Sequence, residues 1–133
     1  MAMQEDFCLL GLVTDEPDYK LCWRINQALG LAFEKLDDLK LFHKRLVTEQ
    51  LFSIFAYYDD AAMLTYRIIK NRSDHGHFLD ELKNLDFLVH IQGELAEEKI
   101  QEFIKRTATL TGVRMCVPVD LKRIRDRERL LLW

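Results

Sequence analysis

The side chains with the clearest metal-binding potential lie in one polar segment near the middle of the chain, Asp74-His75-Gly76-His77. Two imidazoles separated by one residue can coordinate the same metal ion, because each neutral ring offers a nitrogen lone pair. A stable zinc site needs further protein ligands, and the neighbouring sequence offers no obvious third one. We therefore interpret the segment as an exposed polar loop and expect neither a metal nor another cofactor.

Two carboxylates, Glu81 and Asp86, follow shortly afterwards. As a functional pair they could perform acid–base chemistry or hold a cation. As structural groups they could accept hydrogen bonds from loop amides, a neighbouring strand or a basic side chain, and we favour this interpretation. Asp86 and His90 share one face of a predicted strand. Four residues span roughly 13 Å in a strand, so these two side chains cannot form a direct dyad.

The chain shows no sequence signature of a nucleophilic or nucleotide-binding site. No serine lies in a G-x-S-x-G turn, and the five glycines are isolated rather than grouped in a phosphate-binding loop. The cysteines Cys8, Cys22 and Cys116 lie in apolar segments without a C-x-x-C pair, which is typical of buried thiols in a reducing compartment. Glu5 and Asp6 precede the first apolar run, which disfavours a secretion signal. We expect a cytoplasmic protein, and the sequence favours a non-enzymatic one.

The composition is that of a compact folded domain. Of 133 residues, 49% are hydrophobic and 31% are charged, which excludes a disordered chain. At this length we expect one domain that covers residues 1–133. The formal net charge of −3 disfavours a dedicated nucleic-acid-binding protein, whose field is normally basic. No apolar run approaches the ~20 residues that a membrane-spanning helix requires, so we expect no membrane association.

Hydrophobic periodicity predicts alternating strands and helices. Strands are expected at residues 7–14, within 31–43, and at 50–58, 63–71, 85–92 and 113–119. Helices are expected from Thr14 to Leu29 and from Glu97 to Leu110, because each has an apolar stripe at helical spacing. Two helices packed on one mixed, mainly antiparallel sheet of about six strands form a two-layer α+β domain. The hairpin formed by strands 50–58 and 63–71 should lie centrally, and strand 113–119, which contains Pro118, should lie at an edge.

The first predicted helix carries a conspicuous aromatic pair. Tyr19 and Trp23 are four residues apart and flank the apolar stripe that contains Leu21 and Ile25. Residues four apart lie on one side of a helix, so we expect the two rings to stack at the edge of the stripe. The helix should end at Gly30, because glycine readily adopts the left-handed conformation of a C-terminal cap.

Residues 120–133 form a charged and then apolar tail. Five basic residues occur within eight positions: Lys122, Arg123, Arg125, Arg127 and Arg129. Asp126 and Glu128 lie among them, and such alternating signs are typical of a solvated helix face. As an alternative, the basic side chains could form an interaction surface for an acidic partner or a phosphate backbone. Trp133 and the leucines before it either fold back on the core or meet a partner.

Several stretches along the chain resemble a known protein family. The first, Asp18-Tyr19-Lys20-Leu21-Cys22-Trp23, is similar to the first-helix signature of the IPExxxVDY family, small Bacteroidetes proteins named by a motif. The naming motif is similar to Leu79-Asp80-Glu81-Leu82-Lys83-Asn84-Leu85-Asp86-Phe87, in which both acids, Glu81 and Asp86, are kept. Asp80 stands where the family has proline, and this is the one substantial mismatch. The resemblance covers nearly the whole chain and implies no activity, because the family has no assigned function.

Three functions remain, in order of preference. The first is a non-catalytic protein-interaction module that binds an unidentified protein, or a second copy of itself, through the sheet edge or the tail. The second is a small-molecule-binding or enzymatic domain that uses Glu81 and Asp86 in a deep pocket. The third is an RNA-associated factor that uses the C-terminal arginines. Nucleic acid is the less favoured partner because acidic residues lie among these arginines.

Overall fold

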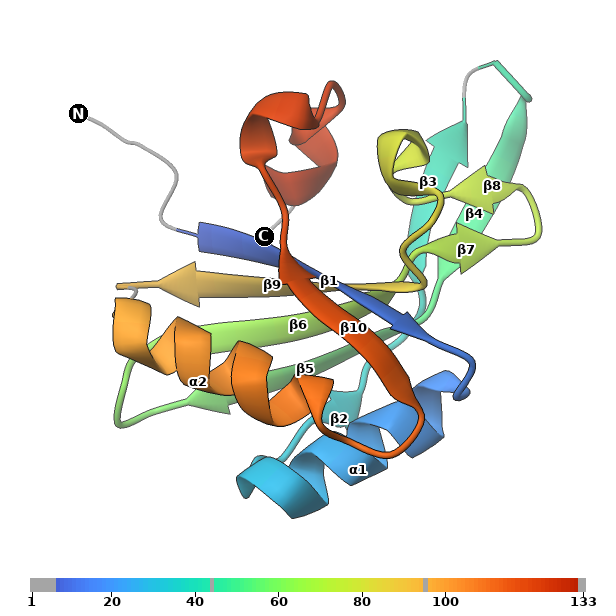
Figure 1. The fold of residues 1–133 in the computed structure, drawn as a ribbon. Helices are drawn as coiled ribbons and strands as arrows, with labels where there is room; N and C mark the ends of the chain where they lie inside the picture. Colours follow the sequence, from blue (N-terminus) through green and yellow to red (C-terminus); the bar gives the residue numbers. More distant parts are fainter. Residues whose placement is uncertain (1–6, 44, 95, 132–133) are drawn as a thin grey trace.

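The computed structural model describes residues 7–43, 45–94 and 96–131, and it contains two α-helices and a main sheet of six strands (Figure 1). The strands of this sheet are β1 (Phe7–Thr14), β2 (Glu34–Lys35), β5 (Ile54–Asp59), β6 (Leu64–Lys70), β9 (Phe87–Gly93) and β10 (Val113–Pro118). Their order is β10-β1-β9-β6-β5-β2, and every neighbouring pair is antiparallel. The α+β class is confirmed. The expected mixed sheet is not observed, since the described strands contain no parallel pair.

Strand β9 lies between β1 and β6, and its side chains are buried on both faces of the sheet. Phe87, Val89 and Ile91 belong to one hydrophobic cluster, whereas Leu88 belongs to another on the opposite face. Successive side chains of a strand alternate between faces, so a continuous buried run requires cover on both sides. The α-helices cover one face of the sheet, and short 3₁₀ helices with their neighbouring segments cover the other.

The two helices, α1 (Asp18–Leu29) and α2 (Glu97–Ala108), cover one face of the sheet, the lower one in Figure 1. The apolar stripes predicted from helical spacing are the buried ones. They contribute Leu21, Cys22 and Ile25 from α1, and Ile100 and Phe103 from α2. Hydrophobic burial of these stripes against the sheet therefore holds both helices in place.

The prediction for α1 is wrong at the start of the helix and correct at its end. The helix begins at Asp18, whereas the sequence predicts a start at Thr14. The Thr14 hydroxyl instead donates a hydrogen bond to the carbonyl of Gly112 at 2.6 Å, and so it joins β1 to the turn before β10. At the other end, Gly30 adopts a φ of 69° and donates its N–H to the Asn26 carbonyl at 2.9 Å. The predicted C-terminal cap is therefore confirmed.

Three short 3₁₀ helices lie on the opposite face of the sheet: η1 (Asp80–Leu82), η2 (Leu121–Arg123) and η3 (Arg127–Leu131). These segments and their neighbours bury apolar side chains such as Leu82, Ile124 and Leu130 against the sheet. The C-terminal tail thus folds back on the core, at least as far as Leu130, which is fully buried. The two-layer arrangement is not confirmed, because this face carries a hydrophobic cluster of its own.

Two small hairpins stand beside the main sheet: β3 (Leu39–His43) with β4 (Thr48–Phe52), and β7 (Arg72–Ser73) with β8 (Gly76–His77) (Figure 1). The sequence predicts one strand over residues 50–58, but the structure has two strands there, β4 and β5, which are separated by Ser53. The Ser53 hydroxyl donates to the carboxylate of Asp18, the first residue of α1. Residues before the break therefore join β3, and residues after it join the main sheet, where β5 and β6 form the predicted hairpin. The predicted edge position of β10 is confirmed.

Candidate interaction surface

The outer face of the β3–β4 hairpin presents two apolar and two charged side chains to solvent. In its register Lys40 lies opposite Leu51, and Phe42 lies opposite Glu49. All four of these residues are exposed, and Phe42 has 59% of its surface accessible. Phe42 and Leu51 lie diagonally across the two strands, close enough to form one apolar contact area. This outer face is therefore open to solvent.

The tip of the hairpin adds two exposed apolar side chains, Leu46 and Val47. The Leu46 N–H donates to Nδ1 of His43 at 3.1 Å, which tightens the turn. Val47 has a φ of 51°, a conformation that a β-branched residue rarely adopts, and it is 75% exposed. Backbone strain of this kind costs about 1–3 kcal/mol and is often kept where it serves a binding site. The side chain of Val47, in this backbone conformation, lies in solvent.

The inner face of the hairpin is fastened to the body of the protein. The Gln50 side chain is buried, and its amide donates to the carbonyl of His75 in the β7–β8 hairpin at 2.8 Å. The adjacent Phe52 packs edge-on against Phe78, with ring centres 5.4 Å apart. The hairpin is thus held at a defined position rather than projecting as a loose arm.

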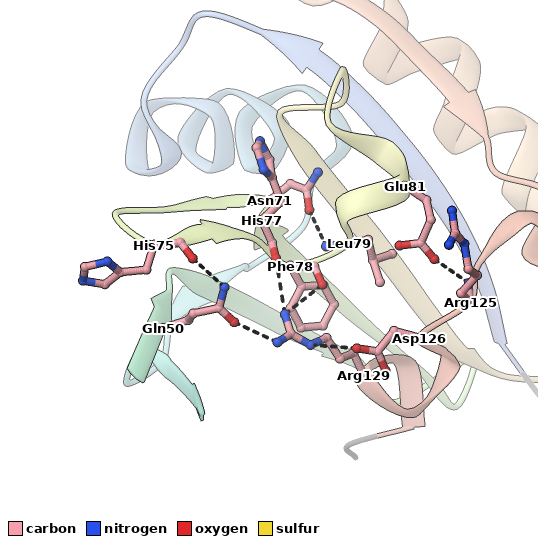
Figure 2. Close-up of polar contacts among 10 residues, drawn as sticks. All are labelled: Gln50, Asn71, His75, His77, Phe78, Leu79, Glu81, Arg125, Asp126 and Arg129. Atoms are coloured by element: carbon pink, nitrogen blue, oxygen red, sulfur yellow. Dashed lines mark hydrogen bonds and ion pairs between the residues drawn. The ribbon is translucent and has the colours of Figure 1, made fainter. Parts of the chain in front are cut away.

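Arg129 completes this attachment from the C-terminal segment (Figure 2). Its guanidinium donates to the carbonyls of His77 and Phe78 at 3.3 and 2.9 Å and to Oε1 of Gln50 at 2.7 Å. It also pairs with Asp126 at 3.2 Å. The side chain is only 15% exposed. Arg129 therefore does not lie on an open basic surface, as the sequence interpretation would place it, but links the tail to both small hairpins.

A groove lies between β3 and the C-terminal segment, and we call it the β3 groove. Its volume is about 560 Å³, within the range of about 300–1,000 Å³ that is typical of binding sites. Leu41, Phe42 and His43 line one wall. Asp80 of η1 and Glu128 of η3 belong to the opposite wall. The groove therefore borders the hairpin directly.

Glu81, one of the two motif acids, also binds the C-terminal segment. Its Oε2 accepts a hydrogen bond from the backbone N–H of Arg125 (Figure 2). Burial opposes ionisation of Glu81, but hydrogen bonds from backbone N–H groups, that of Arg125 first, outweigh it and lower the pKa of the carboxyl. The carboxylate is therefore engaged in joining η1 to the tail.

Asp86, the other motif acid, serves a different part of the fold. Its Oδ2 accepts from the backbone N–H of Thr14 at 2.9 Å, at the end of β1. Its own backbone N–H donates to the carbonyl of Leu12 at 2.8 Å. The pocket beside Asp86 is not lined by Glu81. The two acids thus bind separate backbone segments.

Replacing Glu81 or Asp86 with alanine is expected to lower the free energy of unfolding by about 0.5–3 kcal/mol, because each change removes the acceptor of a backbone N–H. Urea unfolding of both variants tests this. Asp60→Ala is the control, since Asp60 is an exposed acid in the turn between β5 and β6, and it should stay within about 0.5 kcal/mol of the unchanged protein. Wild-type stability in both motif variants would contradict a structural role for these acids.

The aromatic pair of α1 is not stacked. Tyr19 and Trp23 are each more than half exposed, and no ring–ring contact joins them in the described structure. They form a second exposed aromatic area, on the helix face that points away from the sheet.

The remaining basic residues of the tail differ in their exposure. Lys122, Arg123 and Arg125 are exposed, whereas Arg127 is half-buried. Trp133, which the sequence places on the same interaction surface, lies outside the described residues. The described tail therefore offers three well-exposed basic side chains rather than five.

The histidines and cysteines show no arrangement for metal binding. Among residues 7–43, 45–94 and 96–131, no group of three metal-ligating side chains comes together. Burial raises the pKa of the Cys8 thiol to about 11 and of Cys22 and Cys116 to about 12. Thiols with such high pKa values are poor nucleophiles at neutral pH, because the thiolate is the reactive form.

The exposed residues of the hairpin, Phe42, Leu46, Val47 and Leu51, were not predicted from the sequence. One signal for them was present. Residues 39–43 and 48–52 can form two short strands separated by a turn, and an outer face then follows from alternation.

The chain contains no helix, in the described ranges, with the length and apolar content that a bilayer span requires. Comparison with protein-family models, curated proteins and solved structures finds no match to this chain.

Proposed function

We propose that this chain is a non-catalytic protein-interaction module whose contact surface is the outer face and tip of the β3–β4 hairpin. The observation that carries the proposal is the exposure of four apolar side chains on one small element: Phe42, Leu46, Val47 and Leu51. Removing apolar surface from water on association is favourable by about 25 cal/mol per Å². Exposed apolar patches on folded domains are therefore typical of binding sites.

The fixed position of the hairpin supports the same proposal. Gln50, Phe52 and Arg129 hold its inner face, so a partner would meet an ordered surface. Binding to an ordered surface costs less conformational entropy than binding to a mobile loop. Phe42 is the natural centre of such a contact, because large aromatic side chains dominate interface energies.

The polar groups of the chain support an interaction module more than an enzyme. Glu81 and Asp86 are each engaged by a backbone N–H, from Arg125 and Thr14 respectively. The two acids also border different parts of the molecule, so they do not form a paired site. Their contacts resemble those of structural groups rather than those of an acid–base pair.

Site-specific photo-crosslinking in cells tests the proposal. A benzophenone amino acid at Val47 should give a discrete adduct with a partner protein, since Val47 is the most exposed of the four apolar side chains of the hairpin. The same amino acid at Lys105, an exposed position on α2, is the matched control and should give none. Phe42→Ser and Leu51→Ser should each weaken the contact by about 1–2 kcal/mol, which is roughly five- to thirtyfold.

Two results would contradict the proposal. One is the absence of any adduct at Val47, and the other is the same adducts at Val47 and Lys105. Urea unfolding of the Phe42→Ser and Leu51→Ser variants serves as the folding control. Both side chains are exposed, so both substitutions should leave stability within about 0.5 kcal/mol of the unchanged protein.

We further propose that the chain is a cytoplasmic member of the IPExxxVDY family of Bacteroidetes. The support is the segment Leu79-Asp80-Glu81-Leu82-Lys83-Asn84-Leu85-Asp86-Phe87, which keeps both motif acids. In this chain the two acids tie the motif segment to the tail and to β1. Such contacts would explain why a motif is built around them without any catalytic group.

A further inference from the structure

The β3 groove runs along a free strand edge. Among the described strands β4 is the only neighbour of β3, so the other edge of β3 carries no partner strand there. Leu41, Phe42 and His43 are consecutive, and their side chains point to alternate faces. A groove that all three residues line must therefore lie at the edge of the strand rather than over one face. Main-chain N–H and C=O groups at such an edge are available to an added strand.

The charges of the groove favour a basic occupant. Asp80 and Glu128 are exposed carboxylates on the wall that faces β3. Asp126 lies on the same wall and already pairs with Arg129, so the positive charge of that arginine is balanced within the wall. Arg45, at the turn end of β3, adds one positive charge, so the lining carries three carboxylates against two guanidinium groups and has a net charge of −1. The exposed ring of Phe42 adds a surface on which a lysine or arginine side chain can be stabilised by a cation–π contact.

We infer that the β3 groove binds an extended peptide segment rich in lysine or arginine, which adds to the free edge of β3 as a third strand. This inference rests on the proposed interaction function and names the kind of partner. In the bound form, main-chain hydrogen bonds to β3 give affinity, and contacts of basic side chains with Asp80 and Glu128 give selectivity.

A second copy of this chain fits the groove less well than a lone segment. The β3 strand of a second copy would bring its own β4, because these two strands are paired. The groove holds about 560 Å³ and is also lined by η1 and η3, and a pair of strands needs about twice the room of a single strand. An extended segment without a flanking strand meets no such obstacle.

Fluorescence anisotropy of the full chain with a labelled peptide of alternating lysine and valine tests the inference. Two N-methylated versions are measured beside it, one methylated at the lysines and one at the valines. Along a strand the N–H groups of alternate residues point to opposite edges, so only one set can donate to β3. We expect saturable binding of the parent peptide and a loss of at least about tenfold for one methylated version. Equal binding of all three peptides would overturn the inference.

Charge-reversal variants test the selectivity. Asp80→Lys/Glu128→Lys should weaken binding at least about tenfold. Asp60→Lys/Glu98→Lys carries the same change in net charge at exposed positions outside the groove, and it should bind within about threefold of the unchanged protein. An equal loss in both double variants would show unspecific charge attraction and overturn the inference. So would the absence of saturable binding at concentrations up to about 1 mM.

The same samples separate this inference from the proposed function. A Val47 adduct in cells without binding of the lysine–valine peptide would overturn the groove inference and leave the interaction function standing. Absence of both would overturn both. Sedimentation velocity adds one more outcome, since a dimer that Asp80→Lys/Glu128→Lys abolishes and Leu51→Ser leaves intact would assign the groove to a second copy and overturn the basic-peptide inference.

Discussion

Replacing Arg129 with alanine is expected to lower the free energy of unfolding by about 2–4 kcal/mol and to loosen the C-terminal segment. The guanidinium donates to His77, Phe78 and Gln50, and it pairs with Asp126. Without it, the fully buried Gln50 side chain and two main-chain carbonyls lose a donor that water cannot readily replace. The guanidinium also lies 5.8 Å from the ring centres of both Phe52 and Phe78, so the change removes a cation–π contact with each ring.

Urea unfolding and hydrogen exchange of residues 121–131 measure these two effects. Arg129→Lys is the informative partner variant, because an ammonium keeps the charge but cannot serve several acceptors with the planar geometry of a guanidinium. It should recover less than half of the lost stability. Arg123→Ala is the matched control, since it removes an exposed arginine from the same tail. Equal stability of Arg129→Ala and Arg123→Ala would contradict the anchoring role.

Stability is expected to fall by about 3 kcal/mol between pH 6.5 and about pH 4 through His90 alone. His90 is fully buried on β9, stacked on Phe7 with ring centres 4.6 Å apart. Burial, helped by the charge of Arg67, lowers the pKa of His90 from 6.5 to about 4. Its Nε2 lies 3.1 Å from the carbonyl of Leu130, and a carbonyl only accepts, so the neutral ring carries its proton on Nε2.

The sign of the effect follows from proton binding. Between pH 6.5 and about 4 the unfolded chain has taken up a proton on His90, whereas the native state has not. Lowering the pH in this window therefore favours the unfolded state. Above pH 6.5 neither state binds the proton, so titration of His90 does not lower the free energy of unfolding. Below about pH 4 both states bind it and the loss is complete.

His90→Gln isolates this contribution. Glutamine does not titrate, and its amide can still donate toward the Leu130 carbonyl. Urea unfolding of both proteins from pH 7.5 down to about 4.5 should show a shallower decline for the variant. Carboxylates titrate in both proteins and cancel in the comparison. Parallel stability profiles for the two proteins would contradict the buried neutral histidine.

Local patterns in the sequence were sufficient for several elements. The bounds of β1, Phe7–Thr14, agree with the prediction, and α2 begins at Glu97 as expected. Gly30 caps α1 in the left-handed conformation. Each of these features depends on residues within a few positions of one another, which is the range over which strand and helix periodicities act. The apolar faces of both helices were predictable for the same reason.

The boundaries that differ from the prediction depend on partners far along the chain. Thr14 resembles a helix cap in sequence, but its hydroxyl binds Gly112, 98 residues away. The strand predicted over residues 50–58 is interrupted at Ser53, which binds Asp18, 35 residues away. Such contacts exist only after the sheet has formed, and each contributes enough to override a local preference of a few tenths of a kcal/mol.

The sequence by itself therefore determined the α+β class, the helical stripes and the absence of familiar catalytic motifs. Only the tertiary structure distinguished Arg129, whose partner Gln50 is 79 residues away, from the arginines beside it. It alone showed that Gly11 gives room to Leu85, because a Cβ there would overlap the leucine side chain. It alone placed Leu41 against the body and Phe42 in solvent. The physical reason is that periodicity specifies which residues share a face, whereas the cover over that face comes from distant segments.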